Sequence, residues 1–297
     1  MSGAAAYEEV KDPCPVHDGS GWHLFGTGIT APGRFEILHA RAQELRGPWT
    51  LTRPPRMPPL PGGCLAAPGV IAEGEMLHMF LQSDFNALDG RVEHLLSVDA
   101  GQSFRHIDTA LLSLTATAEA GIYDPHPALI DGQAFLSYSA FSEVGSPDIH
   151  LARSLSGEWA GPWERLGPIL CHEEVPFHNA RGSLDYEWGL EGAQLLQLAD
   201  GTVLLTAVCF LTAGATGSRQ RVFLGGAVSA SGPFELCGPF TPPGRTGEDG
   251  HACAVLENGD LFLLMQKRSG VKDAWAYALE PVPLSRLPRV PQMSAGA

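Results

Sequence analysis

Short apolar runs alternate with turn residues along the whole chain. The pattern is clearest in the middle, where four runs rich in β-branched, aromatic or Leu residues are separated by Gly, Pro, Asp and Ser: Tyr123–Ile130, Ala134–Ser139, Asp148–Ser154 and Gly161–Leu166. Such runs are typical of strands. The pair Asp131-Gly132 fits a two-residue hairpin turn, because both central residues of that turn need positive φ. The stretch therefore predicts a four-stranded antiparallel meander.

The same template recurs along the sequence, and the recurrence predicts the fold. Copies begin near residues 12, 67, 124, 191 and 250, and each carries an early turn dipeptide: Asp18-Gly19, Glu73-Gly74, Asp131-Gly132, Asp200-Gly201 and Asn258-Gly259. The repeat starts are roughly 55 to 65 residues apart, a little longer than known propeller-blade periods. Five such units predict an all-β, five-bladed β-propeller with four-stranded antiparallel blades. A length prior alone suggests about two domains, but the uninterrupted repeats favour one domain over 1–297.

Bulk properties narrow the possible partners. The chain is 44% hydrophobic and carries a formal net charge of −14. The acidic balance disfavours nucleic acid, whose phosphates need clustered Lys and Arg. No apolar run is long enough to predict a membrane span. Residues 1–10 lack the basic and apolar regions of a signal peptide, which favours a cytoplasmic location, although a mature fragment of an exported protein stays possible.

The cysteines are scattered. There are six, with no C-x-x-C spacing: Cys14, Cys64, Cys171, Cys209, Cys237 and Cys253. We expect isolated thiols in a reducing compartment rather than disulfides or a thiolate metal site.

Acidic residues stand near the start of several repeats. The first strand of a propeller blade lines the central channel, so residues at these starts should meet at one channel mouth. The positions that we match hold different residues: Asp12, Gly69, Asp124, Glu191 and His251. A single Asp before Pro more often caps a turn, but divergence at matched positions suggests separate roles. Converging carboxylates can divide the roles of acid and base, as glycoside hydrolysis requires.

These motifs resemble those of glycoside hydrolase family 43, the five-bladed arabinanases, β-xylosidases and arabinofuranosidases, and more broadly the clan shared with invertase-type fructosidases. The resemblance rests on Asp12-Pro13, Tyr123-Asp124-Pro125, Glu191-Gly192 and Gly250-His251, in that order and one to a blade. It implies that Asp12 is the general base, that Glu191 is the general acid, and that Asp124 keeps Glu191 protonated and oriented. It also implies that His251 supports a channel cation such as calcium, through its imidazole or through a water, of which water is the more expected.

The second repeat departs from the family pattern. Members usually open this blade with Trp-Ala-Pro-Asp or Trp-Ala-Pro-Glu, whereas this chain has Ala66-Ala67-Pro68-Gly69. We predict an inverting glycosidase acting on a short glycoside or oligosaccharide, with arabinosides or xylosides favoured. The alternative is a non-catalytic carbohydrate-binding or scaffold propeller, because fold does not by itself supply activity.

Aromatic and basic side chains are candidates for substrate contact. They lie near the blade starts or in the long insertion 172–190: Trp22, Tyr123, His126, Arg181 and Trp188. The stretch from Ser97 to Phe104 fits the Asp-box turn of sialidases, which we interpret as a structural brace.

Overall fold

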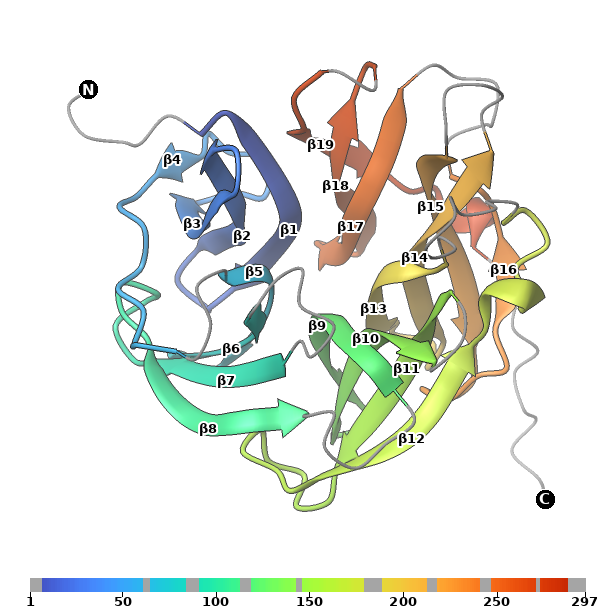
Figure 1. Ribbon diagram of the computed structural model, residues 1–297, viewed down its shortest axis with the longest axis horizontal. Helices are drawn as coiled ribbons and strands as arrows, with labels where there is room; N and C mark the ends of the chain where they lie inside the picture. Colours follow the sequence, from blue (N-terminus) through green and yellow to red (C-terminus); the bar gives the residue numbers. More distant parts are fainter. Residues whose placement is uncertain are drawn as a thin grey trace.

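The computed structural model describes residues 7–60, 65–83, 91–112, 119–142, 146–178, 189–212, 218–240, 247–270 and 273–287. These residues form five antiparallel sheets arranged in a ring, with the first strand of each sheet nearest the centre (Figure 1). The predicted five-bladed β-propeller is confirmed. Four sheets have four strands, and the fifth has three within the described residues. No helix in this part of the chain is long and apolar enough to cross a membrane.

The strands follow the chain in order within each blade. Blades one to three contain β1 (Glu9–His17), β2 (Trp22–Ala31), β3 (Arg34–Ala42), β4 (Thr50–Leu51), β5 (Leu65–Glu73), β6 (Met76–Ser83), β7 (Arg91–Ser97), β8 (Arg105–Leu112), β9 (Glu119–Ile130), β10 (Gln133–Ser142), β11 (Pro147–Ser154) and β12 (Trp163–Leu170). Blades four and five contain β13 (Glu191–Gln197), β14 (Val203–Thr212), β15 (Ser218–Ala227), β16 (Glu235–Cys237), β17 (Glu248–Glu257), β18 (Asp260–Arg268) and β19 (Ala276–Pro281).

Turn chemistry sets the hairpins. At Asp131-Gly132 and Asn258-Gly259 both residues have positive φ, 50° and 74° in the first pair and 54° and 86° in the second. The registers close two-residue loops there, with Ile130 opposite Gln133 and Glu257 opposite Asp260. The predicted two-residue hairpin at Asp131-Gly132 is confirmed.

Apolar side chains fill the interfaces between neighbouring blades. One cluster joins blades three and four through Leu151 and Leu205, and another joins blades one and two through Phe25 and Met79. Blade five packs on blade one through Trp22 and Phe262. Tyr277 Oη also donates to the Lys11 carbonyl at 2.7 Å across this last interface. The ring is therefore closed by side-chain packing and direct hydrogen bonds between its first and last blades.

The Asp-box stretch forms a brace at the β7–β8 connection. Asp99 Oδ1 accepts the Ser103 N–H at 2.9 Å, and Asp99 Oδ2 accepts the Ser103 hydroxyl at 2.6 Å. Gly101, with φ of 78°, sits in the same turn. These bonds hold the loop internally, in agreement with the structural interpretation.

Blades one and two each contain a buried pair of histidines that is hydrogen-bonded to an acidic residue. In blade one, Asp18 Oδ2 lies 2.8 Å from His23 Nε2, and His23 Nδ1 lies 3.0 Å from His39 Nε2. The His39 ring stacks on Phe25 with centroids 4.5 Å apart. The corresponding contacts in blade two join Glu73, His78, His94 and Phe80. Burial, reinforced by the neighbouring His23 or His78, lowers the pKa of both His39 and His94 to about 3.

The lowered pKa values of His39 and His94 predict how the free energy of unfolding depends on pH. The unfolded chain takes up protons on His39 and His94 near the ordinary pKa of about 6.5, whereas the folded protein does so only near pH 3. Between these values the unfolded state binds more protons. The free energy of unfolding should therefore fall as pH drops below 6.5, by about 1.4 kcal/mol per pH unit for each histidine.

Urea unfolding of the parent and of His39→Gln at pH 7, 6 and 5 checks this expectation. The substitution lowers stability at every pH, but it should also make the pH slope shallower by about 1.4 kcal/mol per unit. Parallel slopes for the two proteins would show that His39 is not kept neutral by the fold.

Candidate active site

Every first strand carries a two-residue bulge at the same place. The register skips two residues on the inner strand against one on its partner in β1, β5, β9, β13 and β17. The bulged pairs are Asp12-Pro13, Ala67-Pro68, Asp124-Pro125, Gly192-Ala193 and Gly250-His251. Bulges re-aim side chains and are common near active sites. Here they lie around the channel at the level of the predicted site.

The bulges correct the alignment of the repeats. The residues equivalent to Asp12 are Ala67, Asp124, Gly192 and Gly250, not Gly69, Glu191 and His251 as the sequence suggested. Glu191 precedes its bulge position by one residue, and His251 follows its own by one. A local pattern of alternating residues cannot show the one extra residue of a bulge, because the insertion is visible only in the pairing with the next strand.

Both aspartates adopt left-handed backbone conformations. Asp12 has φ of 54° and Asp124 has φ of 52°. This region costs a non-glycine residue roughly 1–2 kcal/mol, and Asp tolerates it better than most residues. Strained positions that persist in a structure tend to cluster at functional sites. The strain therefore marks the two positions as candidates for function.

The four predicted site residues meet around one imidazole ring. His251 Nδ1 lies 2.7 Å from Asp12 Oδ1, while His251 Nε2 lies 3.4 Å from Asp124 Oδ2 and 3.7 Å from Glu191 Oε2. The side chains are 7–17% exposed, with Asp124 the most buried and Glu191 the most exposed. Three carboxyl groups from three blades thus surround a histidine from a fourth.

Neighbouring residues hold this arrangement in place. The Asp12 backbone N–H donates to Gln266 Oε1 at 2.9 Å. Gly192 has φ of 59°, and a Cβ there would stand 2.6 Å from His251 Cδ2. Only glycine adopts this positive φ without strain and also leaves room for the imidazole. This explains why glycine follows Glu191.

Burial and the neighbouring charges shift the pKa values of His251, Asp12 and Asp124 in different directions. Burial disfavours the charge on His251, but Asp124 and Asp12 outweigh it and hold the pKa of His251 well above its usual value. Burial would likewise raise the pKa of Asp12, but His251 outweighs it and keeps the pKa of Asp12 well below its usual range. For Asp124 burial dominates, opposed by His251 and helped by Glu191, and the pKa is raised to about 7. The site therefore holds an ionised Asp12, a protonated His251 and an Asp124 that carries a proton below neutral pH.

The predicted substrate-binding residues do not all lie with the carboxylates. Tyr123 does, since its hydroxyl donates to Glu191 Oε1 at 3.4 Å. His126 lines a cavity of about 30 Å³ together with Asp12, Asp124 and His251. Arg181 and Trp188 lie outside the described residues.

Trp22 is placed elsewhere. It pairs with His17 at the end of β1 away from Asp12, and it is buried between blades one and five. Its indole N–H donates to Glu257 Oε1 at 3.1 Å. This aromatic residue closes the ring of blades rather than lining the channel, which corrects its assignment to substrate binding.

Among the described residues, the second blade brings no acidic side chain to this cavity. Ala67 occupies the bulge position with φ of 50° and lines the cavity. A Cβ on Gly69 would lie 2.3 Å from the Pro125 carbonyl oxygen and 2.8 Å from His126 Cα. The β9 backbone therefore leaves no room for a side chain at Gly69.

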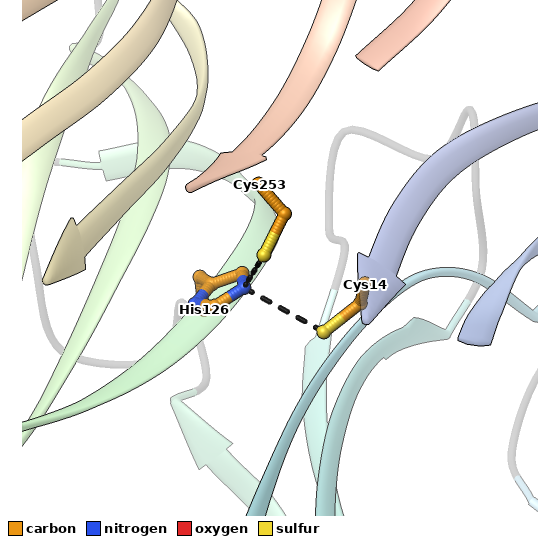
Figure 2. A group of neighbouring side chains, drawn as sticks. All are labelled: Cys14, His126 and Cys253. Atoms are coloured by element: carbon orange, nitrogen blue, oxygen red, sulfur yellow. Dashed lines mark hydrogen bonds between the residues drawn. The ribbon is translucent and has the colours of Figure 1, made fainter. Parts of the chain in front are cut away.

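Two cysteines are not isolated, contrary to the sequence expectation. Cys14 Sγ and Cys253 Sγ lie 3.6 and 3.5 Å from His126 Nε2, on three different blades (Figure 2). A hydrogen bond from Cys253 lowers the pKa of Cys14 well below its usual value against the effect of burial. Positions so far apart in sequence carry no local metal-binding spacing, and only the predicted ring of inner strands could have suggested the cluster.

The donor set around His251 does not suit calcium. Calcium takes 6–8 oxygen ligands, while here two carboxylate oxygens, from Asp124 and Glu191, lie beside His251 Nε2. The protonated imidazole already places a positive charge among the carboxylates. Calcium held at His251 stays a prediction.

The fold matches solved glycoside hydrolase structures. The chain aligns with an endo-arabinase from Bacteroides thetaiotaomicron at a TM-score of 0.71 and 16% identity, over 93% of this chain and 95% of that one. An exo-1,5-α-L-arabinanase from a bovine ruminal metagenomic library gives 0.70 and 13%, over 94% of each chain. A family 43 protein from Bacillus licheniformis gives 0.64 and 15%, over 94% of this chain but 53% of that one.

No protein-family model matches the chain, and no curated protein matches its sequence. At 13–16% identity the structural likeness shows the fold alone. The chain therefore has a five-bladed β-propeller like that of family 43 glycoside hydrolases.

The close approach of β9 to Gly69 predicts a large effect of a small substitution. Gly69→Ala should lower the free energy of unfolding by roughly 1–3 kcal/mol, as overpacking typically does. Gly74→Asn is the matched control, because Gly74 faces open space and Asn tolerates its positive φ. Urea unfolding of both variants checks this; equal losses would mean that β9 moves aside without cost.

Proposed function

We propose that this protein is a glycoside hydrolase that cleaves a short glycoside or oligosaccharide with inversion at the anomeric carbon. The observation that carries the proposal is the convergence of Asp12, Asp124 and Glu191, from three blades, on His251. Carboxyl groups with different protonation states are what glycoside hydrolysis needs. The likeness to arabinanase and xylanase structures is consistent with this chemistry.

Asp12 suits the role of general base. His251 keeps the pKa of Asp12 low, so the carboxylate is ionised throughout the neutral range and can accept a proton from water. Its left-handed backbone at the bulge aims it towards the ring centre.

Glu191 suits the role of general acid. It is the most exposed of the three carboxyl groups, so it is the best placed to reach a leaving-group oxygen. Asp12 and Glu191 approach opposite nitrogens of the His251 ring. Those contacts limit the separation of their oxygens to less than about 9 Å, which admits the ~6.5–9.5 Å of inverting enzymes.

Asp124 acts on the acid rather than on the substrate in this scheme. It is the most buried of the carboxyl groups, and its raised pKa shows that it does not ionise readily beside Glu191 and Asp12. A proton retained near Glu191 Oε2 keeps the acid side of the site ready to protonate a leaving group. Tyr123, bonded to Glu191 Oε1, would fix the orientation of that carboxyl group.

The substrate class is inferred from structures with the same fold and from the second blade. We favour arabinosides or xylosides, because solved structures with this fold are described as arabinanases and a xylanase. The altered second blade has Ala66 where family members usually have Trp and Gly69 where they have an acidic residue, which argues for a changed specificity. It equally supports a second candidate, a carbohydrate-binding propeller without activity. A screen of chromogenic pentosides, hexosides and fructosides separates the two candidates, since complete inactivity with retained sugar binding would favour the second.

Leaving-group dependence tests the roles of acid and base. Glu191→Gln should reduce hydrolysis of substrates with poor leaving groups by roughly 10²–10⁴-fold. It should spare more of the rate on an activated aryl glycoside, whose leaving group hardly needs protonation. Asp12→Asn should damage both reactions, because water must be activated in either case.

Steady-state kinetics of the parent and of three variants, Glu191→Gln, Asp12→Asn and Asp124→Asn, on a matched pair of substrates provide the measurement. Equal losses on both substrates for Glu191→Gln would remove Glu191 from the acid role. If Asp124→Asn, rather than Glu191→Gln, loses more rate on the poor leaving group than on the activated one, Asp124 is the general acid.

The raised pKa of Asp124 predicts a pH effect. In the parent, kcat/KM should fall as pH rises through about 7, where Asp124 loses its proton. Asp124→Asn removes the carboxyl group whose ionisation sets this fall, and with it the proton retained beside Glu191. The fall in activity should therefore move to lower pH in the variant. A pH–rate profile with an unchanged basic limb would exclude Asp124 from this role.

A further inference from the structure

A second layer of polar side chains lies beside the carboxylates in the channel. Cys14, His126 and Cys253 each stand two positions after a site residue, namely Asp12, Asp124 and His251. They project from β1, β9 and β17, and His126 lies between the two sulfurs (Figure 2). Both cysteines are 1–2% exposed. The proposed hydrolysis leaves all three without a role.

The orientation of His126 makes its Nε2 a ligand atom. Its Nδ1 lies 3.2 Å from the Pro127 carbonyl oxygen, so this nitrogen carries the proton and donates it there. Nε2 then has a free lone pair, which faces both Cys14 Sγ and Cys253 Sγ. Metal-binding histidines commonly donate their other N–H to a backbone carbonyl in this way.

The cluster is nearly symmetric about His126 Nε2. One lone pair on Nε2 serves as acceptor for one S–H, yet the two sulfurs lie at nearly equal distances of 3.5 and 3.6 Å. The Val70 N–H donates to Cys14 Sγ at 3.1 Å, a bond that suits a sulfur acting as acceptor. A cation placed among the three atoms satisfies all of them together.

We propose that Cys14, His126 and Cys253 form a binding site for one thiophilic cation, Zn²⁺ in the first instance. Zn–S bonds near 2.3 Å and Zn–N bonds near 2.0–2.1 Å at tetrahedral angles place sulfur and nitrogen about 3.6 Å apart. The observed separations are 3.5 and 3.6 Å, and all three ligand atoms lie within 4.8 Å of one another. The pre-formed spacing therefore matches zinc with little rearrangement.

A small cavity lies beside His126, one of the three proposed ligands. The cavity has a volume of about 30 Å³ and is lined by His126 and Ala252 together with Asp12 and Asp124. A water molecule needs at least about 10–15 Å³ of such space, so the cavity can supply a water as a further ligand. The site would thus complete a tetrahedron with two thiolates, one imidazole and one water-sized ligand.

The bound cation would join three blades. Its ligands come from the inner strands of blades one, three and five, which also carry Asp12, Asp124 and His251. Binding to the folded state alone stabilises that state. We therefore assign the cation a structural role, and this proposal does not depend on the proposed hydrolase activity.

Metal titration of the full chain tests the site. The protein is stripped with a chelator, kept reduced, and titrated with Zn²⁺ by calorimetry and with Cd²⁺ by its thiolate charge-transfer absorption. We expect one equivalent of either ion per chain, and a Tm that rises with zinc concentration. Cys14→Ala and Cys253→Ala should abolish the Cd²⁺ absorption and the Tm shift. His126→Ala should weaken zinc binding by at least ten-fold.

Cys209→Ala is the matched control, because Cys209 is equally buried but bonds the Arg221 carbonyl far from the cluster. It should bind as the parent does. If the Cys14 and Cys253 variants do not fold, a Cys171→Ala/Cys209→Ala/Cys237→Ala variant must keep the full Cd²⁺ signal. Absence of stoichiometric binding in the reduced parent, or undiminished binding after loss of Cys14, would overturn the proposal.

Discussion

The contact between one imidazole and three carboxyl groups is the constraint on which the centre of this propeller depends. Four ionisable groups share a space from which water is largely excluded, and burial penalises each charge separately. The cost is offset because His251 takes a proton, Asp12 gives one up, and Asp124 keeps its own below neutral pH. Removing any one member leaves a buried charge without its partner. The arrangement is therefore cooperative, and its parts come from four different blades.

The backbone delivers these side chains through a repeated irregularity. Regular strands would place alternate side chains into the channel, whereas the bulge in four of the five inner strands turns one residue into a left-handed conformation and re-aims its side chain. Asp12 and Asp124 accept the strained φ, Gly192 avoids strain, and Ala67 accepts strain but contributes no charge. Equivalent positions of one backbone device thus hold a carboxylate, a glycine or an uncharged side chain. In the second blade, the β9 backbone leaves no room for a side chain at Gly69.

Much of this could be predicted from sequence, for identifiable reasons. Turn dipeptides such as Asp131-Gly132 impose local geometry, so the number of blades followed from their recurrence. Asp12, Asp124, Glu191 and His251 came together because the order of their motifs tracks the ring. The exact equivalence of positions did not follow, since a bulge depends on pairing with the neighbouring strand. Trp22 was misassigned because an aromatic residue with a polar tip suits an interface between blades as well as a sugar site.

The two layers of the channel place different demands on a cation. At His251 a divalent ion would compete with the imidazolium for the same carboxylates, and it would disturb the charge balance that keeps Asp12 ionised. At Cys14, His126 and Cys253, two thiolates neutralise the charge of Zn²⁺, so the proposed complex adds no net charge beside Asp12 and Asp124. A neutral metal complex can fix the three strands without altering the field in which the carboxyl groups titrate. With the layers separated by two residues on each strand, the proposed structural and chemical roles would be compatible in one narrow channel.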